Sequence, residues 1–250
     1  MSNRPEEGWL KEGERFDDLQ RNHLKIIQKT EGFRFGMDAV LLSGFTKVKP
    51  GERVMDLCSG NGIIPLLLSA KTPGKQFVGL ELLPENVEMA NRSVAFNGLE
   101  ECITIIEGDV RRAVETFGGA SFDVVTCNPP YMKAGHGIRS EGDLRLCARH
   151  EICLTLPEMV EQVVKLLKPK GRAYFVHRPF RLTELFGCMH DAGLEAKRMR
   201  LVYPYADKEP NMVLVEGIRG GKPYLKVDPP LVVYEETDKY SREILETYGY

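Results

Sequence analysis

Short apolar runs alternate with longer segments of mixed polarity along most of this 250-residue chain. An apolar run of strand length, bounded by turn-forming residues, is typical of a strand that is buried on both faces of a sheet. The mixed segments carry apolar residues at helical spacing, and the clearest one has Pro near its first turn and Gly just past its end. The predicted strands cover residues 53–57, 76–81, 103–106, 122–127, 172–176, 196–203 and 212–218. The predicted helices cover residues 63–70, 84–97, 156–167, 182–192 and 238–248.

The order of these elements predicts the fold class. Strands that are separated by helices imply right-handed crossovers and a mostly parallel sheet. The last two runs have no helix between them and can pair as a hairpin, which makes the final strand antiparallel. We therefore predict an α/β three-layer sandwich with a seven-stranded, mostly parallel sheet. Residues 168–171, Lys-Pro-Lys-Gly, are expected to close the helix at 156–167 before the next strand begins.

We expect one domain with two appendages. Residues 36–222 hold the alternating elements and form the predicted core. Residues 1–35 are polar with scattered aromatic side chains, and we interpret them as an N-terminal extension that caps the sheet or the site. Residues 223–250 are interpreted as a C-terminal appendage that packs on the core.

Composition narrows the class of protein. No apolar stretch approaches the roughly 18 residues that are needed to span a bilayer, and the N-terminus lacks the apolar core of a signal peptide. A cytoplasmic protein is therefore expected. The six cysteines include no Cys-x-x-Cys pair and no histidine at zinc-finger spacing, so no metal site is predicted.

Charge is nearly balanced over the whole chain but not along it. The formal net charge is −2, which argues against simple non-specific binding to nucleic acid. Residues 132–222, however, carry 16 Lys and Arg against 11 Asp and Glu, an excess of +5. This excess fits a surface that faces phosphates, and it fits ordinary solvated helix faces equally well.

The most informative motif is Asn128-Pro129-Pro130-Tyr131, which directly follows the predicted strand at 122–127. Two consecutive prolines cannot continue a strand, because each lacks an N–H and fixes φ. The chain therefore leaves the sheet at the carboxyl end of a strand, where ligands bind in open α/β sheets. An amide oxygen and a carbonyl can accept hydrogen bonds from an –NH2 group, and a tyrosine ring can stack on a flat base. We expect this turn to hold a planar amine for chemistry.

Three other strand ends carry carboxylates. Asp56 begins an Asp-x-x-x-Gly-x-Gly turn, in which the acid would repel a pyrophosphate but suit an ammonium-bearing ligand. Glu81 ends the second strand, where a carboxylate holds a ribose diol in dinucleotide folds. Asp109 follows the third strand and could accept from an adenine amine. A structural role stays open for each: a turn cap for Asp56 and ordinary exposed carboxylates for the other two. Four polar strand ends in succession favour a shared site.

This combination resembles the class I S-adenosylmethionine-dependent methyltransferases, which have a Rossmann-like fold, over roughly residues 35–219. Within that class, Asn-Pro-Pro-Tyr is the signature of enzymes that methylate amino groups. Two further segments, residues 33–42 and 148–151, look like a bacterial family within the "methyltransferase small domain" group. That family methylates the adenine next to the anticodon of a valine tRNA. One departure is that this chain has no strongly basic terminal arm, which leaves the exact RNA open.

The resemblance implies S-adenosylmethionine as the cofactor and a role for each matching residue. The implied cofactor-binding residues are Phe35, Gly36, Asp38, Asp56, Cys58, Ser59, Gly60, Asn61, Gly62, Glu81, Leu82, Asp109, Val110 and Asn128. The implied catalytic residues are Asn128, Pro129, Pro130 and Tyr131. In this scheme the Asn128 side-chain oxygen and the Pro129 carbonyl accept from the substrate amine, and Tyr131 stacks on the base.

The segment after the motif, residues 132–150, is long, polar and rich in glycine. Loops of this length are usually functional or disordered, and we interpret this one as a substrate lid. Lys133, Arg139 and Arg145 are expected to meet RNA phosphates. Arg149 either meets phosphate or pairs with Glu151, and a structural role is favoured for His150 over a role as a base. RNA, most specifically tRNA, is the expected partner, with no membrane and no metal, and the oligomeric state is left open.

Several other functions use parts of the same pattern. A protein methyltransferase acting on a glutamine amide shares the tetrapeptide, but such enzymes usually carry a sizeable helical N-terminal domain. A guanine-directed rRNA methyltransferase usually has Phe or Trp where this chain has Tyr131. A non-catalytic binding protein with the same fold is a third alternative, since fold does not imply function. A nicotinamide-dependent oxidoreductase is disfavoured, because the Gly-x-Gly-x-x-Gly spacing of such enzymes is absent from the turn at residues 56–62.

Overall fold

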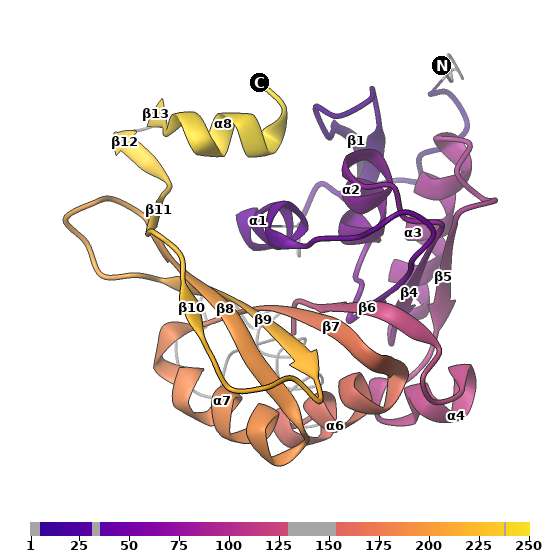
Figure 1. The fold of residues 1–250 in the computed structure, drawn as a ribbon. Helices are drawn as coiled ribbons and strands as arrows, with labels where there is room; N and C mark the ends of the chain where they lie inside the picture. Colours follow the sequence, from indigo (N-terminus) through magenta and orange to yellow (C-terminus); the bar gives the residue numbers. More distant parts are fainter. Residues whose placement is uncertain (1–5, 32–35, 130–153, 238) are drawn as a thin grey trace.

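The structure is a computed structural model that describes residues 6–31, 36–129, 154–237 and 239–250. Its central feature is a twisted sheet with strand order β10-β8-β9-β7-β6-β3-β4-β5, in which β11 also pairs with β8 (Figure 1). The main strands are β3 (Arg53–Leu57), β4 (Gln76–Glu81), β5 (Ile103–Glu107), β6 (Phe122–Cys127), β7 (Leu167–His177), β8 (Leu194–Tyr203) and β9 (Met212–Arg219). Two short strands, β10 (Lys226–Val227) and β11 (Leu231–Val232), extend the sheet beyond β8.

The predicted fold class is confirmed. Strands β3 to β7 pair in parallel, and β9 is antiparallel to both β7 and β8. The parallel connections place the carboxyl ends of β3, β4, β5 and β6 at one edge of the sheet, where the polar strand ends of the sequence fall.

Helices cover both faces of the sheet (Figure 1). Helices α1 (Met37–Phe45), α2 (Ile63–Lys71) and α3 (Pro84–Phe96) share one buried core with the sheet. Helices α4 (Ala113–Phe117), α6 (Leu156–Leu166) and α7 (Leu182–Asp191) share a second core with the opposite face. Successive residues of a strand point to opposite faces, so Val54 joins the first core and Met55 the second. Two short 3-10 turns, Val110–Arg112 and Pro179–Arg181, follow β5 and β7. Among the described helices, none is both long and apolar enough to cross a membrane.

Two predicted boundaries were wrong. Residues 168–171 do not separate α6 from the next strand, because β7 begins at Leu167 and these residues bulge out of it. The register with β6 jumps from Phe122↔Leu167 to Val124↔Arg172, and Lys170 has a positive φ of 65°. The C-terminal helix, α8 (Arg242–Tyr248), begins later than residue 238. The residues before it form a small antiparallel pair, β12 (Tyr234–Glu236) with β13 (Lys239–Tyr240).

The N-terminal segment forms an antiparallel hairpin that the sequence pattern did not reveal. Strands β1 (Glu14–Asp18) and β2 (Lys25–Lys29) pair along their whole length, and β2 packs on α3. The Ile27 N–H donates to the Ser93 hydroxyl of α3 at 2.9 Å. Both Ile26 and Ile27 are fully buried. The hairpin is therefore attached to α3 through β2.

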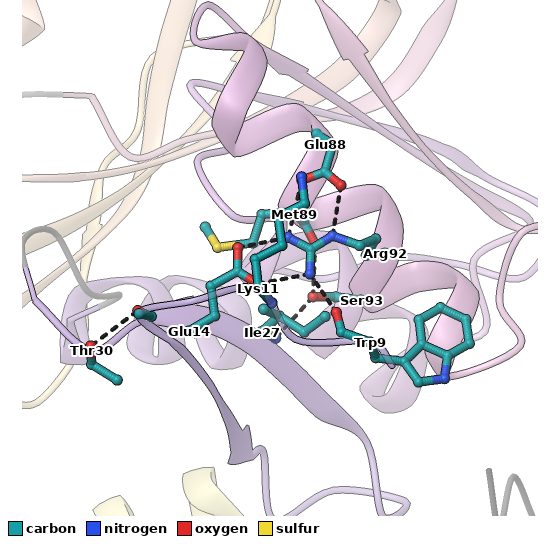
Figure 2. A network of polar contacts seen from close by, with 10 residues as sticks. Trp9, Lys11, Glu14, Ile27, Thr30, Glu88, Met89, Arg92 and Ser93 are labelled. Carbon is teal, nitrogen blue, oxygen red and sulfur yellow. Dashed lines mark hydrogen bonds and ion pairs between the residues drawn. The ribbon is translucent and has the colours of Figure 1, made fainter. Parts of the chain in front are cut away.

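Arg92 of α3 is the polar centre of this attachment (Figure 2). Its guanidinium donates to both carboxylate oxygens of Glu14, at 2.7 and 2.6 Å, and to Glu88 one turn earlier at 2.7 Å. It also donates to the Trp9 carbonyl. These hydrogen bonds from Arg92 lower the pKa of the Glu14 carboxyl below its usual value. The paired charges join the hairpin to the helix.

Candidate functional site

Polar residues from four strand ends meet at the carboxyl edge of the sheet. Five of the predicted cofactor-binding residues line one pocket there, together with Leu80 and Leu154. These five are Cys58, Glu81, Leu82, Asp109 and Val110. They come from the ends of β3, β4 and β5, which lie side by side in the sheet. The structure therefore brings together residues that are up to about fifty positions apart in the sequence.

Glu81 is buried at the wall of this pocket, with 3% of its surface exposed. One carboxylate oxygen accepts from the Gly60 N–H at 2.9 Å. The other accepts from the Leu83 N–H at 3.0 Å and from the Asn86 amide at 3.3 Å. These donors hold the carboxylate in one orientation and attach the glycine turn to the end of β4. Each carboxylate oxygen has further lone pairs, so the group can still accept hydrogen bonds from a ligand.

The turn after β3 needs glycine for its backbone. Gly60 and Gly62 have φ of 57° and 80°, and Cys58 between them and the strand has φ of 58°. Glycine adopts such angles without strain, whereas Cys58 adopts one at some cost in free energy. A Cβ on Gly62 would also lie 3.2 Å from the Ala90 Cβ. Asn61 is buried within the turn, and no donor among the described residues reaches its Oδ1.

Asp56 lies behind this turn, fully enclosed. It accepts from the Ser59 hydroxyl and from the Thr126 hydroxyl, each at 2.7 Å. Burial raises the pKa of the Asp56 carboxyl to about 7, against the lowering effect of the two hydroxyls. Asp56 and Ser59 are thus a buried pair that supports the turn, and neither lines the pocket.

Asp109 caps the short turn after β5. Its carboxylate accepts from the Arg111 N–H at 2.9 Å and from the Arg111 guanidinium. The hydrogen bonds from Arg111 lower the pKa of the Asp109 carboxyl, so this acid is charged at neutral pH. Asp109 and Val110, at the start of this turn, line the same pocket as Glu81.

Asn128 stands one residue beyond the end of β6. Its side-chain Oδ1 is buried, and no donor in the described part of the chain reaches it. The following Pro129 is buried as well. Leaving a buried acceptor unpaired costs about 1–3 kcal/mol, and most such groups in folded proteins have a partner. Within the described ranges, the Asn128 amide oxygen is therefore a candidate acceptor for a ligand.

Other predicted residues lie elsewhere or outside the described ranges. Gly36 and Asp38 lie at the start of α1, where Asp38 accepts from the Ala39 N–H at 2.9 Å. The remaining predicted residues are outside the part of the chain that the structure describes: Phe35, Pro130, Tyr131, Lys133, Arg139, Arg145, Arg149 and His150.

Sequence reasoning missed Thr126 and Asn86. Thr126 is the one hydroxyl residue in the apolar run of β6, and its parallel register places it directly beside Asp56. Asn86 lies in the first turn of α3 and reaches back to Glu81. The signal for both was a polar residue close to a strand end, but only the strand pairing shows what each one contacts.

The described residues hold no group of three His, Cys, Asp or Glu side chains that could bind a metal ion. The cysteines within the described ranges, Cys58, Cys102, Cys127 and Cys188, are free thiols.

Comparison with known proteins identifies the family. The family model of the methyltransferase small domain matches residues 36–190. The chain belongs to this family. Its members are methyltransferases, and the predicted enzyme class and the predicted cofactor, S-adenosylmethionine, are confirmed with it.

Three relatives show how far the similarity extends. The tRNA1(Val) (adenine(37)-N6)-methyltransferase of Aeromonas hydrophila is 30% identical over 75% of this chain and 77% of its own length. The protein with the same name from Porphyromonas gingivalis is 29% identical over 76% of each chain. The ribosomal protein uL3 glutamine methyltransferase of Bordetella pertussis is 33% identical, but over only 42% of this chain and 33% of its own length.

Solved structures share the fold. The crystal structure of a predicted O-methyltransferase from Agrobacterium tumefaciens superposes with a TM-score of 0.69 at 19% identity, covering 85% of this chain and 95% of that one. A structure of geranyl diphosphate methyltransferase with its bound cofactor has a TM-score of 0.56 at 14% identity, over 73% of this chain and 76% of that one. At these identities the likeness concerns the fold alone.

Proposed function

We propose that this enzyme methylates the exocyclic amine of adenine in RNA, and specifically of the adenine next to the anticodon in a tRNA. The observation that carries the proposal is the buried Asn128 Oδ1 at the end of β6, which no donor among the described residues reaches. The names of the relatives that match three quarters of the chain support the choice of tRNA. Action in the cytoplasm is expected from a tRNA substrate.

The described residues fit S-adenosylmethionine, which supplies a methyl group on a positively charged sulfur. Glu81 offers a fixed carboxylate for ribose hydroxyls. Leu82 and Val110 offer apolar surface for an adenine, and Asp109 offers an acceptor for its amine. The Asn61 Oδ1, which lacks a donor among the described residues, is available to the amino-acid end of the cofactor. Cys58, Gly60 and Gly62 shape the turn, while Asp56 and Ser59 support it from behind.

Asn128 and Pro129 prepare the substrate amine. An exocyclic adenine amine is a poor nucleophile because its lone pair is delocalised into the ring. When the Asn128 Oδ1 and the Pro129 carbonyl accept its two N–H groups, they orient the nitrogen and stabilise the positive charge that develops on it. Because Asn128 is fixed at a strand end beside a buried proline, little reorganisation accompanies the reaction.

The remaining predicted roles extend this proposal. Tyr131 stacks on the target base, and Pro130 fixes the turn that presents it. Phe35, Gly36 and Asp38 close over the methionine end of the cofactor. Lys133, Arg139, Arg145 and Arg149 contact phosphates of the RNA.

Transfer of tritiated methyl groups tests the proposal. Purified enzyme and labelled S-adenosylmethionine are incubated with fractionated bacterial tRNA, rRNA and ribosomal protein. We expect label in the tRNA, and nucleoside analysis should recover it as N6-methyladenosine. Label that appears only in protein, or in a nucleoside other than adenosine, contradicts the proposal.

A glutamine-amide methyltransferase is the second candidate. The relative from Bordetella pertussis favours it, because the stretch shared with this chain is 33% identical. Asn128 would hold a carboxamide –NH2 in the same way as an adenine amine, so the site geometry fits both substrates. The same labelling experiment separates them, since this candidate places the label in a protein as N-methylglutamine.

A further inference from the structure

A second surface with the features of an RNA contact lies far from the strand-end site. Residues 222–227, which comprise the end of the loop after β9 and the short strand β10, are all exposed. They include Tyr224, 75% exposed, and Val227, 60% exposed. Large apolar side chains exposed together on a basic segment are more typical of a binding surface than of ordinary solvated protein.

The backbone at Tyr224 is strained. Its φ is 144°, a region that residues other than glycine seldom adopt, and the strain costs on the order of 1–3 kcal/mol. Glycine would fit this position without that cost. The ring is nevertheless nearly fully exposed, so its burial does not offset the strain. Stability alone therefore does not account for a tyrosine at residue 224.

Lysines from three segments of the chain lie on or beside the loop that carries this ring, and one of them contacts the ring itself. The Lys197 ammonium lies 5.6 Å from the centre of the Tyr224 ring and donates to the Lys222 carbonyl at 2.9 Å. Lys170, at the bulge of β7, donates to the Gly220 carbonyl. Lys226 pairs with Asp228 at 3.0 Å, and Asp228 also contacts Arg198. We call Lys170, Lys197, Lys222, Tyr224 and Lys226 the Tyr224 surface.

The charge of this surface suits a polyanion. Two carboxylates lie near its four lysines: Asp228, which pairs with both Lys226 and Arg198, and Glu195, which lies beside Gly221. No acidic residue occurs between Glu216 and Asp228 in the sequence. A cationic group over one face of the tyrosine holds the ring in place and leaves its other face for stacking. A second copy of this chain would bring like charges together, so it is the poorer occupant.

The strand register places the Tyr224 surface relative to the site. Lys226 pairs with Arg198, and the register continues through Glu216 and Tyr174 to Thr126 of β6. Thr126 is two residues before Asn128, which corresponds to about 7 Å along the strand. Four strand spacings, about 19 Å, separate β10 from β6. Lys226 is therefore about 20 Å from Asn128. It is too far to touch the base being methylated, but a stem-loop bound at the site reaches that distance.

We propose that the Tyr224 surface binds a second part of the RNA substrate, with an unpaired base stacked on Tyr224 and phosphates against the lysines. The proposal rests on the proposed function, because it takes RNA as the substrate. The Tyr224 surface then contributes to the affinity for RNA and takes no part in methyl transfer.

Stacking of a base on the Tyr224 ring is tested by the binding of fluorescent full-length tRNA, measured by anisotropy with S-adenosylhomocysteine present. Tyr224→Gly removes the ring and relieves the backbone strain, so the variant should fold at least as well as the wild type. Loss of one stacked base predicts tRNA affinity lower by about 5- to 150-fold. Tyr224→Trp should restore binding to near the wild-type level. Tyr250→Ala is the matched control, because Tyr250 is 71% exposed and lies at the C-terminus; it should leave the affinity unchanged.

The dependence of tRNA binding on salt concentration tests whether the lysines contact phosphates. Removal of one phosphate contact by Lys222→Ala should reduce the slope of log affinity against log salt by about 0.7–0.9. Lys165→Ala, on the exposed side of α6, should not change the slope.

Equal affinity of Tyr224→Gly and wild type for tRNA overturns the inference. If the wild type still labels tRNA in the methyl-transfer assay, the proposed function survives that result. A wild type that binds no tRNA overturns both, and a surface that instead mediates self-association in sedimentation overturns the inference alone.

Discussion

The strand-end site and the Tyr224 surface hold their polar groups in opposite ways. At the site, Asp56 and Glu81 are at most 3% exposed, and hydrogen bonds from the surrounding turn fix each carboxylate. On the Tyr224 surface the charged and aromatic groups face solvent, and a few lysine contacts to backbone carbonyls hold the loop. The difference matches two tasks. Chemistry on a weak nucleophile needs acceptors fixed in a desolvated place, whereas attraction of a polyanion works through exposed charges.

This comparison predicts which quantity each substitution changes. Substitutions at the strand ends should alter turnover or cofactor affinity and leave the salt dependence of RNA binding intact. Substitutions on the Tyr224 surface should do the reverse. A substitution in neither region should change stability alone.

The largest effect is expected for Asn128→Ala. Removal of the acceptor takes away stabilisation of the developing charge, so kcat should fall by about 100- to 1000-fold. Affinity for S-adenosylhomocysteine, measured by calorimetry, should stay within about twofold because the pocket residues are untouched. Asn211→Ala provides the control, since Asn211 is exposed in the loop before β9. Near-normal turnover of Asn128→Ala at saturating tRNA would refute the assigned role.

Asp56→Asn should change how stability depends on pH. Burial raises the pKa of Asp56 to about 7 in the folded state, above the ordinary value of 3.8. The folded state therefore holds its proton more tightly, and this contribution to stability is lost as pH rises from about 4 through 7. Urea unfolding of the wild type should lose on the order of 3 kcal/mol across that range from this group. The Asn variant keeps one acceptor oxygen for one hydroxyl and offers an –NH2 donor to the oxygen of the other. It carries no titratable carboxyl and should lack that loss. An unchanged pH profile would contradict the assignment.

Glu81→Gln removes a charge while keeping the shape of the side chain. Hydrogen bonds to charged groups contribute about 1.5–3 kcal/mol, so affinity for S-adenosylhomocysteine should fall by about 10- to 150-fold. Glu107 is the matched control, because it stands beside Glu81 in the strand register but is exposed. Equal losses in Glu81→Gln and Glu107→Gln would show that general charge, and not the oriented carboxylate, attracts the cofactor.

The smallest effect is expected for Arg92→Met, because Arg92 lies neither at the strand-end site nor on the Tyr224 surface. The variant loses the paired contacts to Glu14 and Glu88 that attach the hairpin to α3 (Figure 2). Since Arg92 is partly exposed, the free energy of unfolding should fall by only about 1 kcal/mol. Affinities for tRNA and cofactor should not change. A weaker tRNA affinity would mean that the hairpin belongs to the RNA surface.

The sequence predicted the sheet and the edge that carries the site, because both depend on local signals. Apolar runs that end in Asp, Glu or Asn-Pro-Pro mark strand ends directly, and Asn128 was found in this way. The enclosure of Asp56 was beyond prediction, since it depends on a parallel register that places Thr126 beside it.

Other misses have equally specific causes. Helix α1 is nearly all apolar, so its sequence shows no helical alternation of polar and apolar residues. Strand β1, Glu-Arg-Phe-Asp-Asp, carries too many charged residues to resemble a strand, and it is stabilised by its partner β2. The basic excess in residues 132–222 fitted a phosphate-facing surface and ordinary solvated helix faces equally well, and the position of Lys197 over the Tyr224 ring appears only in the folded chain.

The most direct test of the central claim is a crystal structure of the enzyme with S-adenosylhomocysteine and an adenine-containing tRNA stem-loop. The account predicts the Asn128 Oδ1 within about 2.7–3.2 Å of the exocyclic nitrogen of the target adenine. The sulfur of S-adenosylhomocysteine should face the same nitrogen from the side away from Asn128. An Asn128 amide that is hydrogen-bonded to its own chain, with the adenine amine held elsewhere, would contradict it.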